Sequence, residues 1–477
     1  MRTRIYFSII VLLFVTAACY EDQGSYDYTT VEIPVVKDLV DSTFDAIVGD
    51  TLEITPTVVH SLANTDQLSY KWQFMFPYEP FFQYFEGRTL KTLFSLVPGT
   101  YDATLTITDN SNNLKYYYDF KISAKTEFSV GTVVLTDVGG AAQLAFVKPD
   151  GTIMPNLYEG LNGEPLPSQP KQLLARNLAF QPTNIIDYWV VSGDPQNAGV
   201  IIDASTMKKA SLIRDNFFDP PASFSVNNLQ AGNFYGVTTG VIDHKLYRGT
   251  SNTFYGFPTY GKYGLPAAGD YALADDYILA GADTPGPQYY ITFDTKKKRM
   301  VTFDMATVYK DTTYDVIPTG PGFDPKNIGI DMFAMEHLNN SVALAFARDG
   351  GGKIYEYNFS HDPVTIRPKY RREFKGASLV RENTNFIGTI YEDLYFNSDD
   401  KIYKFSHVNQ DLVALDADFG GKIVTMLKLD KINGKDVLLA GTEGALYYLD
   451  IDTGKNGNIT YTLDGLDGDV IDVAIRK

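Results

Sequence analysis

The amino-acid sequence predicts an all-β protein, with an N-terminal β-sandwich followed by a β-propeller of about seven blades. Polar and apolar residues alternate with a period of two over many short segments, which is typical of half-buried strands. Tyr and Phe are abundant, with 33 and 30 residues, and aromatic residues favour strands. A strand–turn–strand unit also recurs through the C-terminal part of the chain. No segment carries a long apolar period of 3.6 residues, so α/β barrels and helical solenoids are excluded.

The N-terminus predicts a lipoprotein signal. Arg2 and Arg4 precede an apolar run, 5–15, and small residues then lead to Cys19. A positive start, a short apolar core and small residues before the cut describe a secretory signal that is too short to span a membrane. Cys19 is the single cysteine of the chain, so it forms no internal disulfide. The segment resembles the bacterial lipobox, in which such a cysteine is acylated, although Thr16 stands where Leu is usual.

This resemblance implies that residues 1–18 are a removed signal peptide and that 19–29 are a lipidated tether. Acyl chains hold a soluble body at a membrane. Glu21 and Asp22 resemble the surface-export signal of Bacteroidota lipoproteins, so we expect an outer-membrane lipid anchor with the protein exposed at the cell surface. An ordinary signal peptide that happens to contain a cysteine is the alternative.

The charge balance limits the classes of partner. The net charge is −17, from 41 basic and 58 acidic residues, whereas nucleic-acid binding needs clustered Lys and Arg. The one basic run, 296–299, is interpreted as a hairpin turn. With 44% hydrophobic residues, the chain can bury a substantial core.

The first predicted domain spans residues 30–125. Alternating segments separated by Gly, Pro and Asn turns predict a β-sandwich. The turn at 109–113 is expected to join two of its strands as a hairpin. The clearest alternating segments are 51–58, 68–74, 101–109 and 116–122.

Two sequence segments of this domain resemble strands of PKD domains. Tyr70-Lys71-Trp72-Gln73-Phe74 is similar to their Tyr-x-Trp-x-Phe strand, and the segment 98–109 is similar to their Gly-x-Tyr-x-x-x-Leu-x-Ile-x-Asp strand. Trp72 is then expected to fill the core, and Tyr101 to lie at a strand corner with its hydroxyl bonded to the backbone. With the lipoprotein start, residues 19–125 resemble the PKD-like lipoprotein family of Bacteroidota. The resemblance implies a spacer or binding module, which favours presentation over chemistry.

Residues 126–477 are predicted to form the propeller. Blades of four strands take about 40 to 50 residues each, so the spacing of the recurring unit predicts seven. The last strand, 470–475, is expected to close the ring against 132–135, which would remove exposed edges. An irregular run of β-sandwiches is the alternative. The copies of the unit lie at 144–151, 199–208, 290–297, 352–358, 401–406 and 444–455, with a weaker one at 252–256.

Motifs of catalysis are absent from the sequence. It contains no Gly-x-Ser-x-Gly elbow, His-Glu-x-x-His, phosphate loop or dinucleotide fingerprint, and its five histidines lack ligand spacing. Asp450-x-Asp452-x-Gly454 is better interpreted as a hairpin turn than as a calcium loop. We therefore expect no catalytic residue, metal site or cofactor, and no enzyme. Paired carboxylates for glycoside cleavage stay open, because nothing distinguishes a pair among the 58 acidic residues.

Aromatic loops are the better candidates for binding. Gly and Pro interrupt the aromatic run 254–264 and indicate a loop whose rings can stack on sugars or hold peptide side chains. We expect ligand contacts from Tyr255, Phe257, Tyr260 and Tyr263. The alternative is that these rings pack beneath the loop.

A second aromatic cluster lies in the first domain, at residues 74–85. Its prolines exclude a central strand, and a large apolar patch of this kind can dock a protein. We expect partner docking through Phe76, Tyr78, Phe81 and Phe82, with core packing as the alternative.

These observations predict a lipid-anchored binding protein of the cell surface. The family resemblance implies an accessory component of a nutrient-uptake system built around a SusC/SusD-like outer-membrane transporter, with an oligosaccharide or peptide ligand. A surface hydrolase with its active site on the propeller face is one alternative, and a purely structural partner protein is another.

Overall fold

A computed structural model describes residues 31–75, 82–96, 98–194, 196–231, 235–251, 257–283, 287–339 and 341–477. The chain divides into two compact units, Met1–Ala124 and Lys125–Lys477, and each is described by itself. The division falls one residue from the boundary predicted between 125 and 126.

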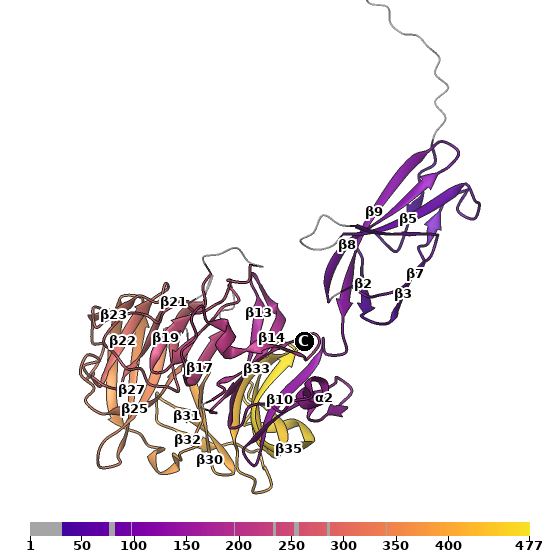
Figure 1. The fold of residues 1–477 in the computed structure, drawn as a ribbon. Helices are drawn as coiled ribbons and strands as arrows, with labels where there is room; N and C mark the ends of the chain where they lie inside the picture. Colours follow the sequence, from indigo (N-terminus) through magenta and orange to yellow (C-terminus); the bar gives the residue numbers. More distant parts are fainter. Residues whose placement is uncertain are drawn as a thin grey trace, which may run out of the picture. The chain divides into compact units, whose positions relative to one another are not determined.

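The first unit is a β-sandwich (Figure 1). Its five-stranded sheet has the order β2-β9-β8-β5-β6, and the short pairs β3–β7 and β1–β4 complete it. As predicted, Trp72 is buried in the core, and its indole Nε1 donates to the Gly87 carbonyl at 2.9 Å. Tyr101 is also buried. The strands are β1 (Val35–Val36), β2 (Thr43–Ile47), β3 (Thr51–Ile54), β4 (Val58–Val59), β5 (Leu68–Met75), β6 (Phe82–Glu86), β7 (Leu90–Leu93), β8 (Gly99–Asp109) and β9 (Leu114–Lys125).

The hairpin predicted at 109–113 joins β8 to β9. The Asp109 carboxylate accepts bonds from the Ser111 backbone at 2.9 Å and from the Asn112 amide at 2.9 Å. Asn113 takes a left-handed conformation, with φ 62°, which Asn tolerates better than most residues. Local side-chain bonds therefore hold this turn.

The described residues of the second unit form seven blades, as the fold prediction required. Their strands are lettered A to D from the axis outwards. Blades 2 to 4 contain β13 (Pro170–Leu178), β14 (Gln181–Ser192), β15 (Gly199–Asp203) and β16 (Lys209–Leu212); β17 (Val226–Ala231), β18 (Thr238–Ile242) and β19 (Lys245–Arg248); β20 (Leu279–Asp283), β21 (Pro287–Asp294), β22 (Arg299–Asp304) and β23 (Tyr309–Asp311).

Blades 5 and 6 follow the same antiparallel pattern. Blade 5 gains an outer parallel strand, β24 (Asp315–Val316), which pairs with β28. The remaining strands are β25 (Asp331–His337), β26 (Val342–Arg348), β27 (Ile354–Asp362) and β28 (Thr365–Glu373) in blade 5, and β29 (Phe386–Gly388), β30 (Asp393–Ser398), β31 (Lys401–Ser406) and β32 (Leu412–Ala414) in blade 6. Helix α2 (Leu157–Asn162) and the 3-10 turns η1 (Ile213–Asn216) and η2 (Ala377–Leu379) lie in connections.

Two long strands build blade 7 and close the ring. β34 (Lys435–Asp450) pairs with β33 (Met426–Ile432) through its first half. Lys435 Nζ lies 3.5 Å from an Asp452 carboxylate oxygen, so the two ends of β34 lie close together. The strand therefore reverses direction, near Gly444, whose φ is 77°. The first half of β35 (Asn458–Arg476) is the D strand of blade 7, paired with the end of β34.

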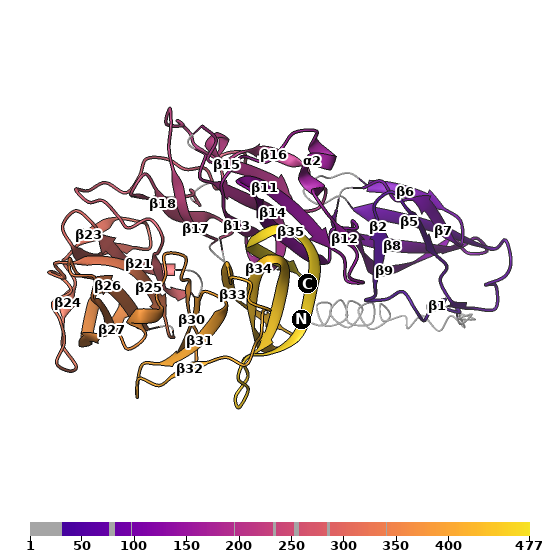
Figure 2. The ribbon, with the colours of Figure 1, turned by 90° about the horizontal axis from the view of Figure 1, so that it is seen from below.

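The second half of β35 is the A strand of blade 1. It pairs antiparallel with β10 (Gly131–Val138), with Val134 opposite Val473, which confirms the predicted closure of 470–475 on 132–135. β11 (Ala141–Val147) and β12 (Ile153–Met154) complete that blade. Figure 2 shows the yellow C-terminal strands beside the purple strands that begin the unit. The first and last strands of the propeller therefore share one sheet.

Side-chain hydrogen bonds connect neighbouring A strands around the ring. Strands that pack on neighbouring blades through both faces are largely apolar. Polar side-chain contacts between blades are therefore found mainly on the A strands, which lie at the axis. The connecting bonds are Leu173 N to Asp472 Oδ2 (2.8 Å), Gln172 Nε2 to Leu229 O (2.8 Å), Gln230 Nε2 to Ile278 O (2.7 Å), Tyr277 Oη to Met332 O (2.8 Å), Asn385 Nδ2 to Thr425 O (3.4 Å) and Thr425 Oγ1 to Val470 O (2.7 Å).

The predicted turns lie where the sequence placed them. Residues 295–298 join β21 to β22, which confirms the basic run as a hairpin turn. Lys296 and Lys297 pair with Asp270 at 2.7 and 3.0 Å, and they lower the pKa of that carboxyl to about 2. Residues 451–457 join the C and D strands of blade 7. The weak repeat at 252–256 lies outside the described residues.

Candidate functional site

The A–B turns of the blades gather at one end of the propeller, here called the A–B end. Arg176 Nη1, before the A–B turn of blade 2, donates to the Gly236 carbonyl in that of blade 3, at 3.0 Å. The Asn339 amide of blade 5 donates to the Glu392 carboxylate of blade 6, at 2.8 Å. Adjacent A–B turns therefore touch at these two junctions.

The predicted aromatic loop lies at the A–B end, as the C–D connection of blade 3. Tyr255 lies outside the described residues. Phe257 is 60% exposed, while Tyr260 is half-buried and donates its hydroxyl to the Tyr235 carbonyl at 2.6 Å. Tyr263 is fully buried and hydrogen-bonded to Thr238, so its ring belongs to the core of the blade. This placement corrects the expectation that Tyr263 contacts a ligand.

Two further aromatic residues belong to this surface, which the sequence did not indicate. Phe180, in the A–B turn of blade 2, is exposed and has a left-handed φ of 64°. It meets Tyr235 edge-to-face at 6.3 Å. The Arg248 guanidinium stands over the Tyr235 ring at 5.8 Å. No repeat or motif marks Phe180, because its role depends on a turn of a different blade.

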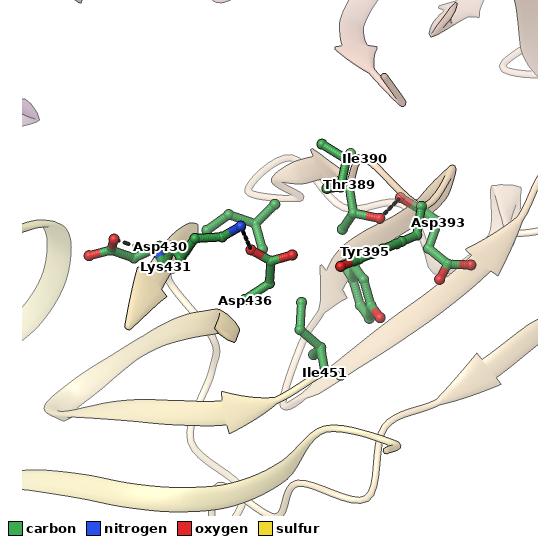
Figure 3. A pocket seen from close by; sticks show the side chains of 11 residues that line it. Thr389, Ile390, Asp393, Tyr395, Asp430, Lys431, Asp436 and Ile451 are labelled. Carbon is green, nitrogen blue, oxygen red and sulfur yellow. Dashed lines mark hydrogen bonds and ion pairs between the residues drawn. The ribbon is translucent and has the colours of Figure 1, made fainter. Parts of the chain in front are cut away.

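A cavity of about 320 Å³ opens at the A–B end between blades 6 and 7 (Figure 3). Its lining includes the A–B turn of blade 6 and both ends of the β33–β34 hairpin of blade 7. Ile390 and Tyr391, two of its lining residues, are 62% and 63% exposed. The full lining is Gly388, Thr389, Ile390, Tyr391, Asp393, Tyr395, Leu429, Asp430, Lys431, Asp436 and Ile451.

Charged groups face the cavity from both blades. Figure 3 shows Lys431 and Asp436 on one side, and Asp393 and Tyr395 on the other. Lys431 Nζ lies 3.5 Å from an oxygen of Asp436. Asp393 pairs with Lys404 at 2.6 Å, and Asp430 pairs with Lys477 at 2.6 Å. Three carboxylates therefore line the cavity, each with a lysine partner.

Tyr395 contributes a buried hydroxyl to the same cavity. The residue is 2% exposed, and among the described residues its hydroxyl has no hydrogen-bond partner. Burial, with the charge of Asp393 beside it, raises the pKa of Tyr395, so the hydroxyl stays protonated at neutral pH. It is free to donate a hydrogen bond into the cavity.

Two carboxyls with raised pKa values are not themselves lining residues of this cavity, although Glu336 contacts Gly388, which is one. Burial raises the pKa of Glu356 to about 7 despite its ion pair with Arg372. Burial also raises the pKa of Glu336 to about 8, although that carboxylate accepts a bond from the Gly388 backbone. Both side chains connect neighbouring strands or blades, so their position points to structural roles.

The structure brings two of the scattered histidines together. The rings of His337 and His361 lie 5.2 Å apart, and His361 Nδ1 lies 2.7 Å from the Tyr289 hydroxyl. Burial lowers the pKa of His361 to about 3, so it is neutral at physiological pH. Among the described residues, no group of three His, Cys, Asp or Glu side chains is arranged to hold a metal ion.

The predicted docking cluster of the sandwich is described in part. Phe76, Tyr78 and Phe81 lie outside the described residues. Phe82 is exposed on β6, the edge strand of the five-stranded sheet. Its neighbour Tyr84 is also exposed and carries Lys71 over its ring at 4.0 Å. The edge position agrees with the expectation that prolines exclude a central strand there.

Cys19 and the predicted signal, 1–18, lie outside the described residues. Across the ranges that the structure describes, no helix has the length and apolarity needed to cross a membrane.

Comparison with known proteins identifies the first third of the chain. Residues 19–170 match the family model described as the PKD-like family, so the match runs beyond the sandwich into the first blade. No curated protein matches the sequence.

Several solved structures are similar in fold. A quinonprotein alcohol dehydrogenase-like protein from Bacteroides thetaiotaomicron is 14% identical in sequence. The match covers 94% of this chain and 100% of that protein's chain, with a TM-score of 0.42. The dihydro-heme d1 dehydrogenase NirN is 10% identical, with coverage of 78% and 73% and a TM-score of 0.40. An auxiliary nutrient binding protein from B. thetaiotaomicron is 10% identical, with coverage of 85% and 95% and a TM-score of 0.34. Likenesses at this level carry no information on ligand or reaction.

Proposed function

From a chain whose first third matches the PKD-like family, we propose a lipid-anchored binding protein of the cell surface. It captures a nutrient at the A–B end of its propeller and serves as an accessory component of a SusC/SusD-like uptake system. It is a binding protein and not an enzyme. Cys19 carries the lipid, and Glu21 and Asp22 direct the protein to the outer face of the outer membrane.

The open cavity between blades 6 and 7 is the observation that carries this proposal. Its volume of about 320 Å³ lies at the lower end of the range for small-ligand sites, about 300–1,000 Å³. Ile390 and Tyr391 expose apolar surface beside it, while Asp393, Asp436 and Tyr395 supply polar groups inside it. Apolar contact area with a few converging polar groups is the usual composition of a binding site.

A hydrolase with paired carboxylates is the competing function. A glycosidase needs one carboxyl that holds a proton at working pH. Each carboxylate that lines the cavity is instead held in an ion pair with a lysine. The cavity therefore supports binding better than acid catalysis.

A pull-down tests the uptake role. The lipidated protein is used as bait in detergent-solubilised outer membranes, and its partners are identified by mass spectrometry. We expect a SusC/SusD-like pair in near-equal amounts. The control is Cys19→Ala, which we expect to lose both membrane association and metabolic labelling by palmitate. Recovery of the bait alone would contradict the uptake role, and turnover of oligosaccharides by the purified protein would contradict the assignment as a binding protein.

A further inference from the structure

The charges that face the cavity between blades 6 and 7 are unbalanced, although each carboxylate has a lysine partner. Asp393, Asp430 and Asp436 line the cavity, but only one lysine, Lys431, does so. The side chains of the three carboxylates are 24%, 25% and 21% exposed. Those of Lys404, Lys477 and Lys431 are 34%, 51% and 58% exposed. The negative groups are therefore built into the walls, while the positive groups stand towards solvent.

Two of these carboxylates also retain an oxygen that can accept a hydrogen bond from a ligand. Lys404 engages Oδ2 of Asp393, and Lys431 engages Oδ1 of Asp436. The other oxygen of each of these carboxylates has no partner among the described residues. Tyr395, almost fully buried between them, adds a hydroxyl that is also without a partner in that part of the chain. Two carboxylate oxygens and one hydroxyl are thus available to a donor that enters the cavity.

The remaining walls are apolar. Leu429, Ile451 and the ring of Tyr395 lie between the charged groups, and Ile390 and Tyr391 expose apolar surface at the opening. A ligand group that suits both surfaces has an apolar stem and a positively charged end. Lys and Arg side chains have this form, since their methylene stems pack on apolar surface while the charged head is hydrogen-bonded.

We propose that this cavity binds the lysine or arginine side chain of a peptide, so that the protein captures basic peptides. The stem packs on Leu429 and Ile451, and the cationic head donates to the Tyr395 hydroxyl and to Asp436 or Asp393, which lie on its two sides. Lys431 turns outward and releases Asp436, because its 3.5 Å contact is loose and its side chain is largely exposed. The inference rests on the proposed binding function and names its ligand class.

Calorimetric titration of the purified mature chain tests the inference with three capped pentapeptides. They carry lysine, Nε-acetyl-lysine or norleucine between glycines, so only the first is cationic. We expect the lysine peptide to bind at least about tenfold more tightly than the other two, because charge-assisted hydrogen bonds are about twice as strong as neutral ones. Its affinity should fall in 0.5 M salt, since salt screens charge pairs at an open site.

Variants then locate the contact. Asp436→Asn and Asp393→Asn should each weaken the lysine peptide about tenfold and leave the acetyl-lysine peptide unchanged. The matched control is Asp270→Asn, because Asp270 is an exposed lysine-paired carboxylate outside the cavity lining, and we expect no change. If either cavity variant fails to fold, two comparisons on the unmodified chain still test the inference: the lysine peptide against the acetyl-lysine peptide, and low salt against high salt.

Equal affinity for the lysine and acetyl-lysine peptides would overturn the inference. Tighter binding of a glucosamine hexamer than of the lysine peptide would also overturn it, in favour of an amino-sugar ligand. The pull-down separates these failures from a failure of the proposed function. Recovery of a transporter without preference for lysine would refute only the ligand class, whereas preference for lysine without a transporter would refute only the uptake role.

Discussion

In the described part of the chain, side chains bridge the junction between blades 2 and 3, whereas the junction between blades 6 and 7 holds a cavity. In the first, Arg176 reaches from blade 2 to the Gly236 carbonyl of blade 3 and is held by Asp187. In the second, a cavity lies between the A–B turn of blade 6 and the β33–β34 hairpin of blade 7. The A strand of blade 6 packs tightly on blade 5 instead, because a Cβ atom at Gly388 would stand 1.7 Å from the His337 carbonyl oxygen.

The junction between blades 5 and 6 is also bridged by side chains. There Asn339 bonds to Glu392, which also meets His407 Nε2 at 3.1 Å. Arg372, paired with Glu356, donates to the His407 carbonyl at 2.6 Å. A side-chain network thus fills the gap. The scaffold leaves room between A–B turns, and the residues that occupy this room determine whether a junction is structural or open to a ligand.

The largest effect is expected from opening the closed junction between blades 2 and 3. Arg176→Ala would leave the Asp187 carboxylate buried without its cation, and breaking a buried pair by removing one partner costs about 3–5 kcal/mol. Urea unfolding followed by tryptophan fluorescence measures the loss, since Trp189 Nε1 donates to Asp187 at 2.9 Å. A loss below about 1 kcal/mol, as for an exposed pair, would show that Arg176 does not hold the junction.

A pH effect of intermediate size is expected from the junction between blades 5 and 6. The pKa of Glu356 rises from 4.5 to about 7 on folding, so between these values the folded state binds more protons than the unfolded state. Its contribution to stability is therefore present below pH 4.5 and is lost as pH rises through 7. A pKa change of this size corresponds to at most roughly 3–4 kcal/mol.

Glu356→Gln should remove this part of the pH dependence. Unfolding free energies of the variant and the unmodified chain at pH 5, 6, 7 and 8 give the difference directly. Parallel pH profiles would contradict the assignment of a raised pKa to Glu356.

At the open junction, we expect an effect on binding without an effect on stability. Tyr391→Ala removes an exposed ring beside the cavity, and such surface changes usually alter stability by less than about 0.5 kcal/mol. Loss of an aromatic contact should weaken the lysine peptide about five- to tenfold, since rings of this kind are frequent binding hot spots. Unchanged affinity would exclude Tyr391 from the site.

The smallest effect is expected at the aromatic loop of blade 3. If the open junction is the site, Phe257→Ala should change the affinity for the lysine peptide by less than about twofold, because contacts outside a binding centre contribute little. A larger loss would support the prediction from the sequence that the aromatic loop contacts the ligand. The same calorimetric titration measures this change.

The sequence predicted features that depend on strands and turns. Ring closure could be predicted because alternating apolar strands at the two ends of the propeller require each other as partners. Trp72 and the Asp109 hairpin followed from alternation and turn chemistry. The recurring unit indicated seven blades even though its copies occupy different strands: 199–208 includes a C strand, whereas 290–297 lies on a B strand.

The cavity could not be predicted, because it joins segments that are distant in sequence. Its walls come from 388–395, 429–436 and Ile451. Tyr263 failed as a ligand residue for a related reason. The loop folds back as the D position of blade 3, which places this ring in the core while Phe257 stays outside.

Site-specific fluorescence tests the central claim most directly. The natural chain has one cysteine, Cys19, which the lipid would block, so Tyr391→Cys and Phe257→Cys each offer a single site for an environment-sensitive label. Each labelled protein is titrated with the lysine peptide and with a neutral maltohexaose. We predict a saturable change at position 391 with the lysine peptide and none at 257. A response at 257 without one at 391, or to the sugar alone, would contradict the claim that the open junction is the binding site for basic peptides.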